Sequence, residues 1–214
     1  MESAIVLMAA LAYAIWNALV KNSDDKLLSL TFVRFIGIIL GCIVIVTQPS
    51  MQMSILPYVL LASCIHFVYF YCLINTYQLG DFSQVYPVSR GLAPMLVLFA
   101  SMFFVHDNLT SWQIFGTLLI CTGLIYLAAS NSTIAAAPLI FAIATAFCIA
   151  GYTLVSGVGV RLSESFLVYA AWLEVVTGAG VLVFSVIRRG KETVAFGIRN
   201  WKHGSLTGIL SIGG

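Results

Sequence analysis

Apolar residues fill the chain in long runs that short polar breaks separate. Seven of these runs hold about 20 residues, which is the length that an α-helix needs to cross the ~30 Å hydrocarbon core of a bilayer. They are Ser3–Val20, Leu27–Thr47, Ile55–Tyr77, Ser83–Val105, Ser111–Ala129, Pro138–Val160 and Ser163–Ile187. An eighth run begins at Ser205 and covers about half of a bilayer by Gly214.

The polar breaks carry turn-forming residues, as in Asn22–Asp25 and Ser130–Thr133. The apolar runs do not alternate apolar with polar residues and are about twice as long as a membrane-spanning strand, which excludes a β-barrel. The pattern therefore predicts an all-α, polytopic membrane bundle in which about 7.5 transmembrane helices are present.

Composition supports this fold class and excludes others. Of the 214 residues, 61% are apolar and 8% are charged, and the mean hydropathy is +1.03. A soluble domain carries about a quarter charged residues, and a disordered chain needs low hydrophobicity. The net charge of +2 argues against a nucleic-acid partner. The five cysteines lie in apolar runs without a CxxC motif, so we expect neither disulfides, a metal site nor a cofactor.

A weak internal repeat divides the chain. A shift of 134 positions lays Ala12–Ile15 over Ala146–Ile149, and five helices precede the second copy. An odd number of spans makes the two copies opposite in orientation, as in many secondary transporters. We therefore predict a five-helix repeat at residues 1–130 and an incomplete inverted copy at 136–214. The complete form is expected to continue past Gly214; the alternative is a short re-entrant tail.

Loop charges bear on the membrane orientation, because lysine and arginine in short loops favour the cytoplasm. Only one such residue, Arg161, follows an even-numbered run. Seven follow odd-numbered runs: Lys21, Lys26, Arg188, Arg189, Lys191, Arg199 and Lys202. The last five of these lie in the single loop that is expected after the seventh run. This count places the N-terminus outside.

Ionisable residues inside the apolar runs are the strongest functional candidates. A charged residue at a helix centre costs about 2.5–3.5 kcal/mol on insertion scales, so it should face the bundle interior and have a partner. Arg90 leads, because Tyr86, Arg90 and Pro94 share a helix face and two prolines remove backbone donors nearby. Either Arg90 faces a central pathway and attracts an anionic group, or an acidic residue or free carbonyl holds it in a structural role.

Three further ionisable residues carry similar alternatives. Arg34 either lines the pathway or extends to the membrane interface along its own stem. Glu174 is either a proton-coupling carboxylate or the structural partner of Arg34 or Arg90. His66 lies in an aromatic run and is either a pathway residue or a hydrogen-bonded packing residue.

A polar stripe on the first run predicts a cavity wall. Tyr13, Asn17 and Lys21 recur at four-residue spacing with Trp16 beside them, although Lys21 also fits an interface anchor. Trp112 and Trp201 near helix ends are expected to be interface residues.

Small residues at helical spacing predict close helix packing, at Gly37 and Gly41 and again at Gly116 and Gly123. The sequence has no HExxH motif, no P-loop and no paired aspartate array, which argues against an intramembrane enzyme.

Residues Gly80–Pro94, Asp107–Gly116 and Gly123 resemble the EamA-type branch of the drug/metabolite transporter superfamily. Ala14–Asn17 and Arg34 are similar to the opening of the family's first unit, although His106-Asp107 stands where the family commonly has Gly-Glu. The resemblance implies ten helices in two inverted units and outward movement of small metabolites, often amino acids or drugs, across the cytoplasmic (inner) membrane. It also implies that both termini are cytoplasmic, against the charge count.

We therefore predict a secondary transporter that works by alternating access, with a small-molecule solute and the bilayer as its partners. The alternative is a non-transporting, truncated membrane protein or a receptor-like bundle. Glu174 is the predicted proton carrier. The predicted substrate pathway comprises Trp16, Asn17, Arg34, His66, Tyr86, Arg90 and Pro94.

Overall fold

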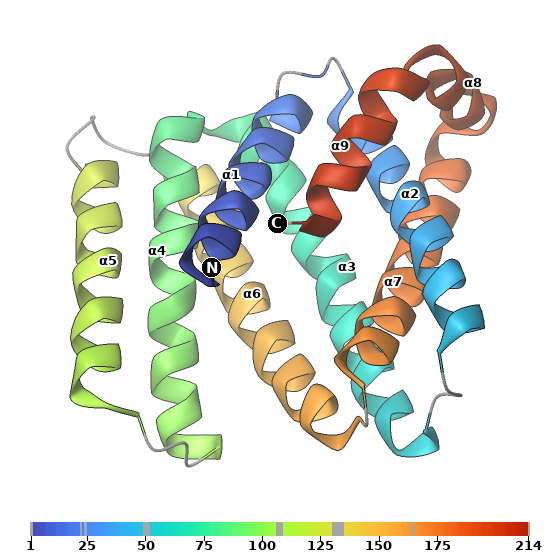
Figure 1. Ribbon diagram of the computed structural model, residues 1–214. Helices are drawn as coiled ribbons and strands as arrows, with labels where there is room; N and C mark the ends of the chain where they lie inside the picture. The colour runs from blue at the N-terminus through green and yellow to red at the C-terminus, as the bar shows by residue number, and fades with distance from the viewer. Residues whose placement is uncertain are drawn as a thin grey trace. The chain divides into compact units, whose positions relative to one another are not determined.

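The computed structural model describes residues 2–21, 23, 25–48, 52–105, 109–129, 135–163 and 165–213, and helices dominate these residues (Figure 1). The α-helices are α1 (Glu2–Lys21), α2 (Lys26–Thr47), α3 (Leu56–Leu79), α4 (Phe82–Ala100), α5 (Ser111–Ala129), α6 (Ala136–Leu162), α7 (Phe166–Arg189), α8 (Lys191–Arg199) and α9 (Trp201–Gly213). A 3-10 turn, Met53–Ile55, precedes α3, and a π-helical turn, Ser101–Val105, follows α4.

The membrane character predicted from the sequence is confirmed. Within the described residues, five helical stretches are long and apolar enough to cross a bilayer: Lys26–Thr47, Met53–Leu79, Phe82–Phe103, Ala136–Leu162 and Phe166–Arg189. A shorter apolar helix covers Ser111–Leu127. The protein is therefore an all-helical, multi-pass membrane protein.

Polar breaks fix the helix ends through capping. The carboxylate of Asp25 accepts a hydrogen bond from the Leu28 amide at 3.1 Å and caps α2, and Asp81 accepts one from the Ser83 amide at 2.9 Å and caps α4. Gly190 ends α7 with a φ of 52°, a left-handed conformation that favours glycine. The acidic residues in the breaks thus begin the helices that follow them.

The chain packs as two compact units. Unit 1 comprises residues 1–53 and 163–214 and holds α1, α2, α7, α8 and α9, whereas unit 2 comprises residues 54–162 and holds α3 to α6. Unit 1 therefore takes helices from both of the repeats that the sequence predicts, at 1–130 and 136–214. The repeat itself stays a prediction.

In unit 1, α2 and α7 lie side by side in opposite directions and are in close contact at glycines (Figure 1). A Cβ added to Gly41 would lie 3.0 Å from the Ala171 carbonyl oxygen, and one added to Gly178 would lie 3.1 Å from the Arg34 carbonyl oxygen. The close approach predicted for Gly37 and Gly41 is therefore confirmed.

Helix α9 packs on the same helix α2 but runs parallel to it. Phe32 lies against Gly204, and Ile36, one turn later, lies against Gly208. Helices α7 and α9 thus both pack along α2.

In unit 2, α3 packs against α6 and α4 packs against both α5 and α6. Thr76 and Thr145 are fully buried with their hydroxyl oxygens 3.4 Å apart, and each hydroxyl also donates to a carbonyl one turn earlier in its own helix. Gly91 lets α4 approach the Leu124 side chain and the Cys121 carbonyl of α5. These contacts join helices that the sequence could not pair.

The prediction of close approach at Gly116 and Gly123 is wrong. A Cβ added to either glycine would meet nothing within 4 Å among the described residues, because the α5 face that carries them is not packed there. Spacing in the sequence is the same for packed and unpacked glycines, so it cannot separate the two.

The loop predicted between the seventh and eighth runs is also wrong. Residues 191–199 form α8, and α9 begins at Trp201 rather than at Ser205. The five cations assigned to that loop all lie in the helices α7, α8 and α9. A nine-residue helix of mixed polarity is too short and too polar to register as an apolar run, which is why the sequence pattern missed it.

Substitution Gly41→Leu should destabilise the protein by about 1–3 kcal/mol, because the new side chain would collide with the backbone of α7. The matched control is Gly123→Leu, whose side chain would enter open space. The measurement is the free energy of unfolding in a detergent titration. Equal losses in the two variants would contradict the close α2–α7 packing.

Candidate functional site

An ion pair joins α2 to α7 inside unit 1. Nη1 of Arg34 donates to both carboxylate oxygens of Glu174, at 2.7 and 2.8 Å. Each residue lies about 12 Å along its helix from the first residue, which is well inside both candidate spans. The side chains are 15% and 34% exposed. Of the predicted alternatives, pairing of Glu174 with Arg34 is confirmed, and extension of Arg34 to the interface is wrong, because the carboxylate holds the guanidinium.

Gly37 makes room for this pair. A Cβ added to Gly37 would lie 2.7 Å from Oε2 of Glu174, so any larger residue would push the carboxylate aside. The glycine therefore positions the Glu174 side chain as well as allowing the helices to approach.

Arg90 of α4 lies beside two tyrosines in unit 2. Its Nη2 donates to the Tyr69 hydroxyl of α3 at 3.3 Å, and its Cζ lies 5.5 Å from the centre of the Tyr86 ring. A cation in this position is attracted by the negative face of the ring. Tyr86 in turn stacks on Phe82 with the ring centres 4.7 Å apart. The predicted shared face of Tyr86 and Arg90 is thus confirmed by their contact.

His66 completes a group of rings near Arg90. Its Nδ1 donates to the Ala62 carbonyl oxygen at 3.0 Å, and its ring stacks on Tyr152 with centres 3.8 Å apart. The ring of Tyr69 lies edge-to-face with the rings of His66 and Tyr152, with the ring centres 6.2 and 5.8 Å apart. We refer to His66, Tyr69, Tyr86, Arg90 and Tyr152 as the Arg90 cluster.

The remaining predicted residues differ in their burial. Trp16 and Asn17 of α1 are buried in unit 1, with 6% and 4% of their surface exposed, whereas Pro94 of α4 is exposed. The side chains of Tyr13 and Lys21, and residues His106 and Asp107, lie outside the part of the chain that is described. The structure therefore groups Arg34 with Glu174, and His66 with Tyr86 and Arg90.

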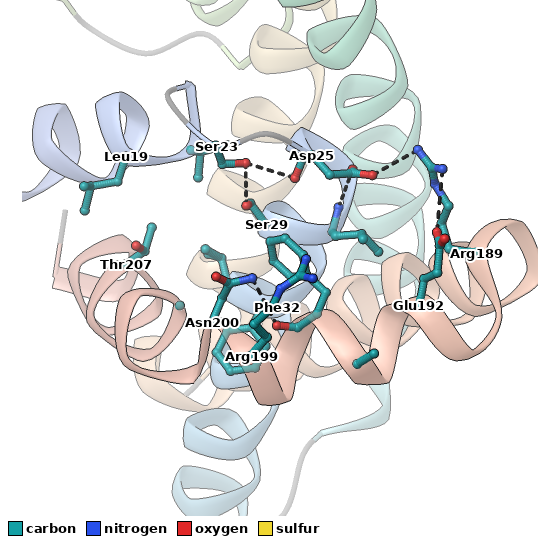
Figure 2. Close-up of a pocket in the computed structure, with 16 residues that line it drawn as sticks. Leu19, Ser23, Asp25, Ser29, Phe32, Arg189, Glu192, Arg199, Asn200 and Thr207 are labelled. Atoms are coloured by element: carbon teal, nitrogen blue, oxygen red, sulfur yellow. Dashed lines mark hydrogen bonds and ion pairs between the residues drawn. The ribbon is translucent and has the colours of Figure 1, made fainter.

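A cavity of about 850 Å³ opens in unit 1 among α1, α2, α7, α8 and α9 (Figure 2). None of the residues predicted for the pathway lines it. Its lining is mixed, with Phe32, Val33 and Phe196 among the apolar residues and Arg199 and Asn200 among the polar ones. Neither Arg34 nor Glu174 is among the residues that line it.

Charged residues form part of the lining of this cavity (Figure 2). Arg189, the last residue of α7, pairs with Asp25 at 3.0 Å and lies 3.8 Å from Glu192 of α8. Ser29 donates to the Ser23 hydroxyl at 2.6 Å, and Ser23 donates to the Asp25 carbonyl. The sequence pattern places these residues in turns and in a loop, far apart along the chain. The signal that could have paired them was an acidic residue at one break and a basic residue at another.

Among the described residues, no three histidine, cysteine or acidic side chains lie close enough together to hold a metal ion. The five cysteines are free.

Removing one member of the α2–α7 ion pair should destabilise the protein by about 2 kcal/mol, less than for a fully buried pair because Glu174 is a third exposed. The variants are Arg34→Met and Glu174→Met, measured by detergent unfolding. The double variant should lose less than the sum of the two single losses, because it leaves no uncompensated charge. Additive losses would show that the two residues do not interact.

One comparison with known proteins identifies a family. The model of the EamA-like transporter family matches residues 2–129, which is more than half of the chain. The match runs from α1 to the end of α5 and includes Arg34 and Arg90. No curated protein and no solved structure matches the chain. This multi-pass, all-helical membrane protein belongs to the EamA-like transporter family.

Proposed function

We propose that the protein is a secondary transporter that exports small metabolites, such as amino acids or drugs, across the cytoplasmic membrane by alternating access. Family membership supports transport of the drug/metabolite type. The observation that carries the finer proposal is the Arg90 cluster, a guanidinium set among aromatic rings within a candidate span.

The chemistry of the Arg90 cluster suits an amphipathic anion. A guanidinium offers a planar fork of donors that matches a carboxylate, and the surrounding rings offer apolar faces to the rest of a solute. Tyr69 and Tyr86 hold the guanidinium from two sides, so it is oriented before a solute arrives. Pro87 and Pro94 loosen the backbone of α4, as in broken helices that line transport sites.

The Arg34–Glu174 pair supplies a candidate coupling device in unit 1. The carboxylate is 34% exposed and is the member of the pair that can take up a proton. Protonation of Glu174 removes the charge that holds Arg34 and frees the guanidinium for an anionic group. Because the pair ties α2 to α7, its loss also loosens the contact between these two helices. One proton would thereby change both the binding and the packing of unit 1.

Unit 1 also holds a cavity of a size that suits a small molecule, separate from the residues proposed for the pathway. Its volume of about 850 Å³ lies within the ~300–1,000 Å³ range typical of small-molecule sites. Buried Trp16 and Asn17 on α1 remain proposed pathway residues in the same unit.

Replacing Arg90 with glutamine should lower transport at least ten-fold, because a neutral amide cannot hold a carboxylate as a guanidinium does. The measurement is the flux of radiolabelled aromatic and aliphatic amino acids in proteoliposomes. The control is Arg161→Gln, which removes the same charge from the exposed end of α6. Retained flux in Arg90→Gln would remove this residue from the site, and no flux in the unaltered protein would contradict the transport proposal.

Replacing Glu174 with glutamine should abolish the response of flux to an imposed pH gradient, because a glutamine amide, unlike a carboxylate, does not take up a proton. Amino-acid exchange at equal pH on both sides should remain, since it requires no net proton movement. The same proteoliposomes measure both rates. A flux that still follows the pH gradient in Glu174→Gln would assign proton coupling to another group.

A further inference from the structure

The short helix α8 lies at one end of the unit 1 spans. It joins the end of α7 to the beginning of α9 (Figure 1). Its nine residues extend about 13 Å, which is less than half of the hydrocarbon thickness. Because α7 is a candidate span that ends at Arg189, α8 begins where that span meets the membrane surface.

The two faces of α8 differ in what they contact. Glu192, Ala195 and Phe196 recur at three- and four-residue spacing and line the unit 1 cavity (Figure 2). Val194 and Ile198 lie four residues apart on another face and are 62% and 72% exposed. Trp201, at the start of α9, is 59% exposed. This apolar face is uncovered in the described part of the chain.

The charges around this face are unbalanced. Residues 188–202 contain five of the ten lysine and arginine residues and a single acidic residue, Glu192. Asp25 and Glu192 both lie against Arg189. Arg188 and Lys191 are exposed and form no ion pair with any described residue. The segment therefore presents cations that have no acidic partner among the described residues, next to an apolar surface.

We propose that α8 is an interfacial helix that binds anionic phospholipid. Val194, Ile198 and Trp201 enter the boundary between acyl chains and headgroups, while Arg188 and Lys191 contact lipid phosphates. A short helix with an exposed apolar face and cations beside it suits this boundary, and an indole ring such as that of Trp201 is favoured at the same depth. Charge complementarity favours an anionic lipid over a zwitterionic one. Each Lys or Arg near the membrane surface strengthens the binding of anionic lipid about five-fold.

The test uses fluorescence of Trp201 in bilayers of phosphatidylcholine that contain brominated phosphatidylglycerol or brominated phosphatidylcholine. Bromine quenches a tryptophan that it contacts, and the signal of a Trp201→Phe variant is subtracted to isolate Trp201. We expect quenching to be strongest when bromine lies near the headgroup end of the acyl chain. We also expect brominated phosphatidylglycerol to quench more than brominated phosphatidylcholine at equal content.

Arg188→Gln and Lys191→Gln should each lower the preference for phosphatidylglycerol about five-fold. Arg161→Gln removes one cation from the end of α6 in unit 2 and should leave that preference unchanged. If no brominated lipid quenches Trp201, a protein surface, such as that of a second copy, covers this face, and the proposal is overturned. Equal quenching by the two lipids would overturn the anionic part. Neither readout depends on transport, so failure of the proposed function leaves this test intact.

Discussion

A charge inside a membrane must be neutralised by a partner, and the Arg34–Glu174 pair is where this requirement shapes unit 1. The pair obliges α2 and α7 to be neighbours although 140 residues separate its two members. Close neighbours need small residues, and Gly41 and Gly178 supply them where the backbones approach. Gly37 then leaves the space that the carboxylate occupies. Packing and electrostatics at this contact therefore depend on the same few positions.

The two intramembrane arginines illustrate two ways of keeping a guanidinium in an apolar span. Arg34 has a carboxylate within 2.8 Å, so its charge is largely compensated by the protein. Arg90 instead has a tyrosine hydroxyl and a tyrosine ring beside it, and these two contacts orient the group. This difference underlies the separate roles that we propose for them.

The sequence predicts most of the helices because a spanning run is a long, local signal, and most observed bounds lie within a few residues of the predicted ones. Which helices touch is not a local property. Arg34 had two alternatives until the structure placed Glu174 beside it, and Gly123 has the same small side chain as Gly41 without a neighbour. The cavity was missed for a similar reason, because Asp25 and Arg189 lie in breaks far apart in the chain and meet only after folding.

Unit 1 is assembled from the two ends of the described chain, and this imposes an order on its synthesis. At about 5–20 residues per second, a ribosome needs roughly 7–28 s to add the 140 residues that separate Arg34 from Glu174. Unit 2 is continuous in sequence and is complete first. During that interval the Arg34 guanidinium of α2 lacks the carboxylate of α7. The charge of α2 therefore has to be accommodated without this partner until α7 has been made.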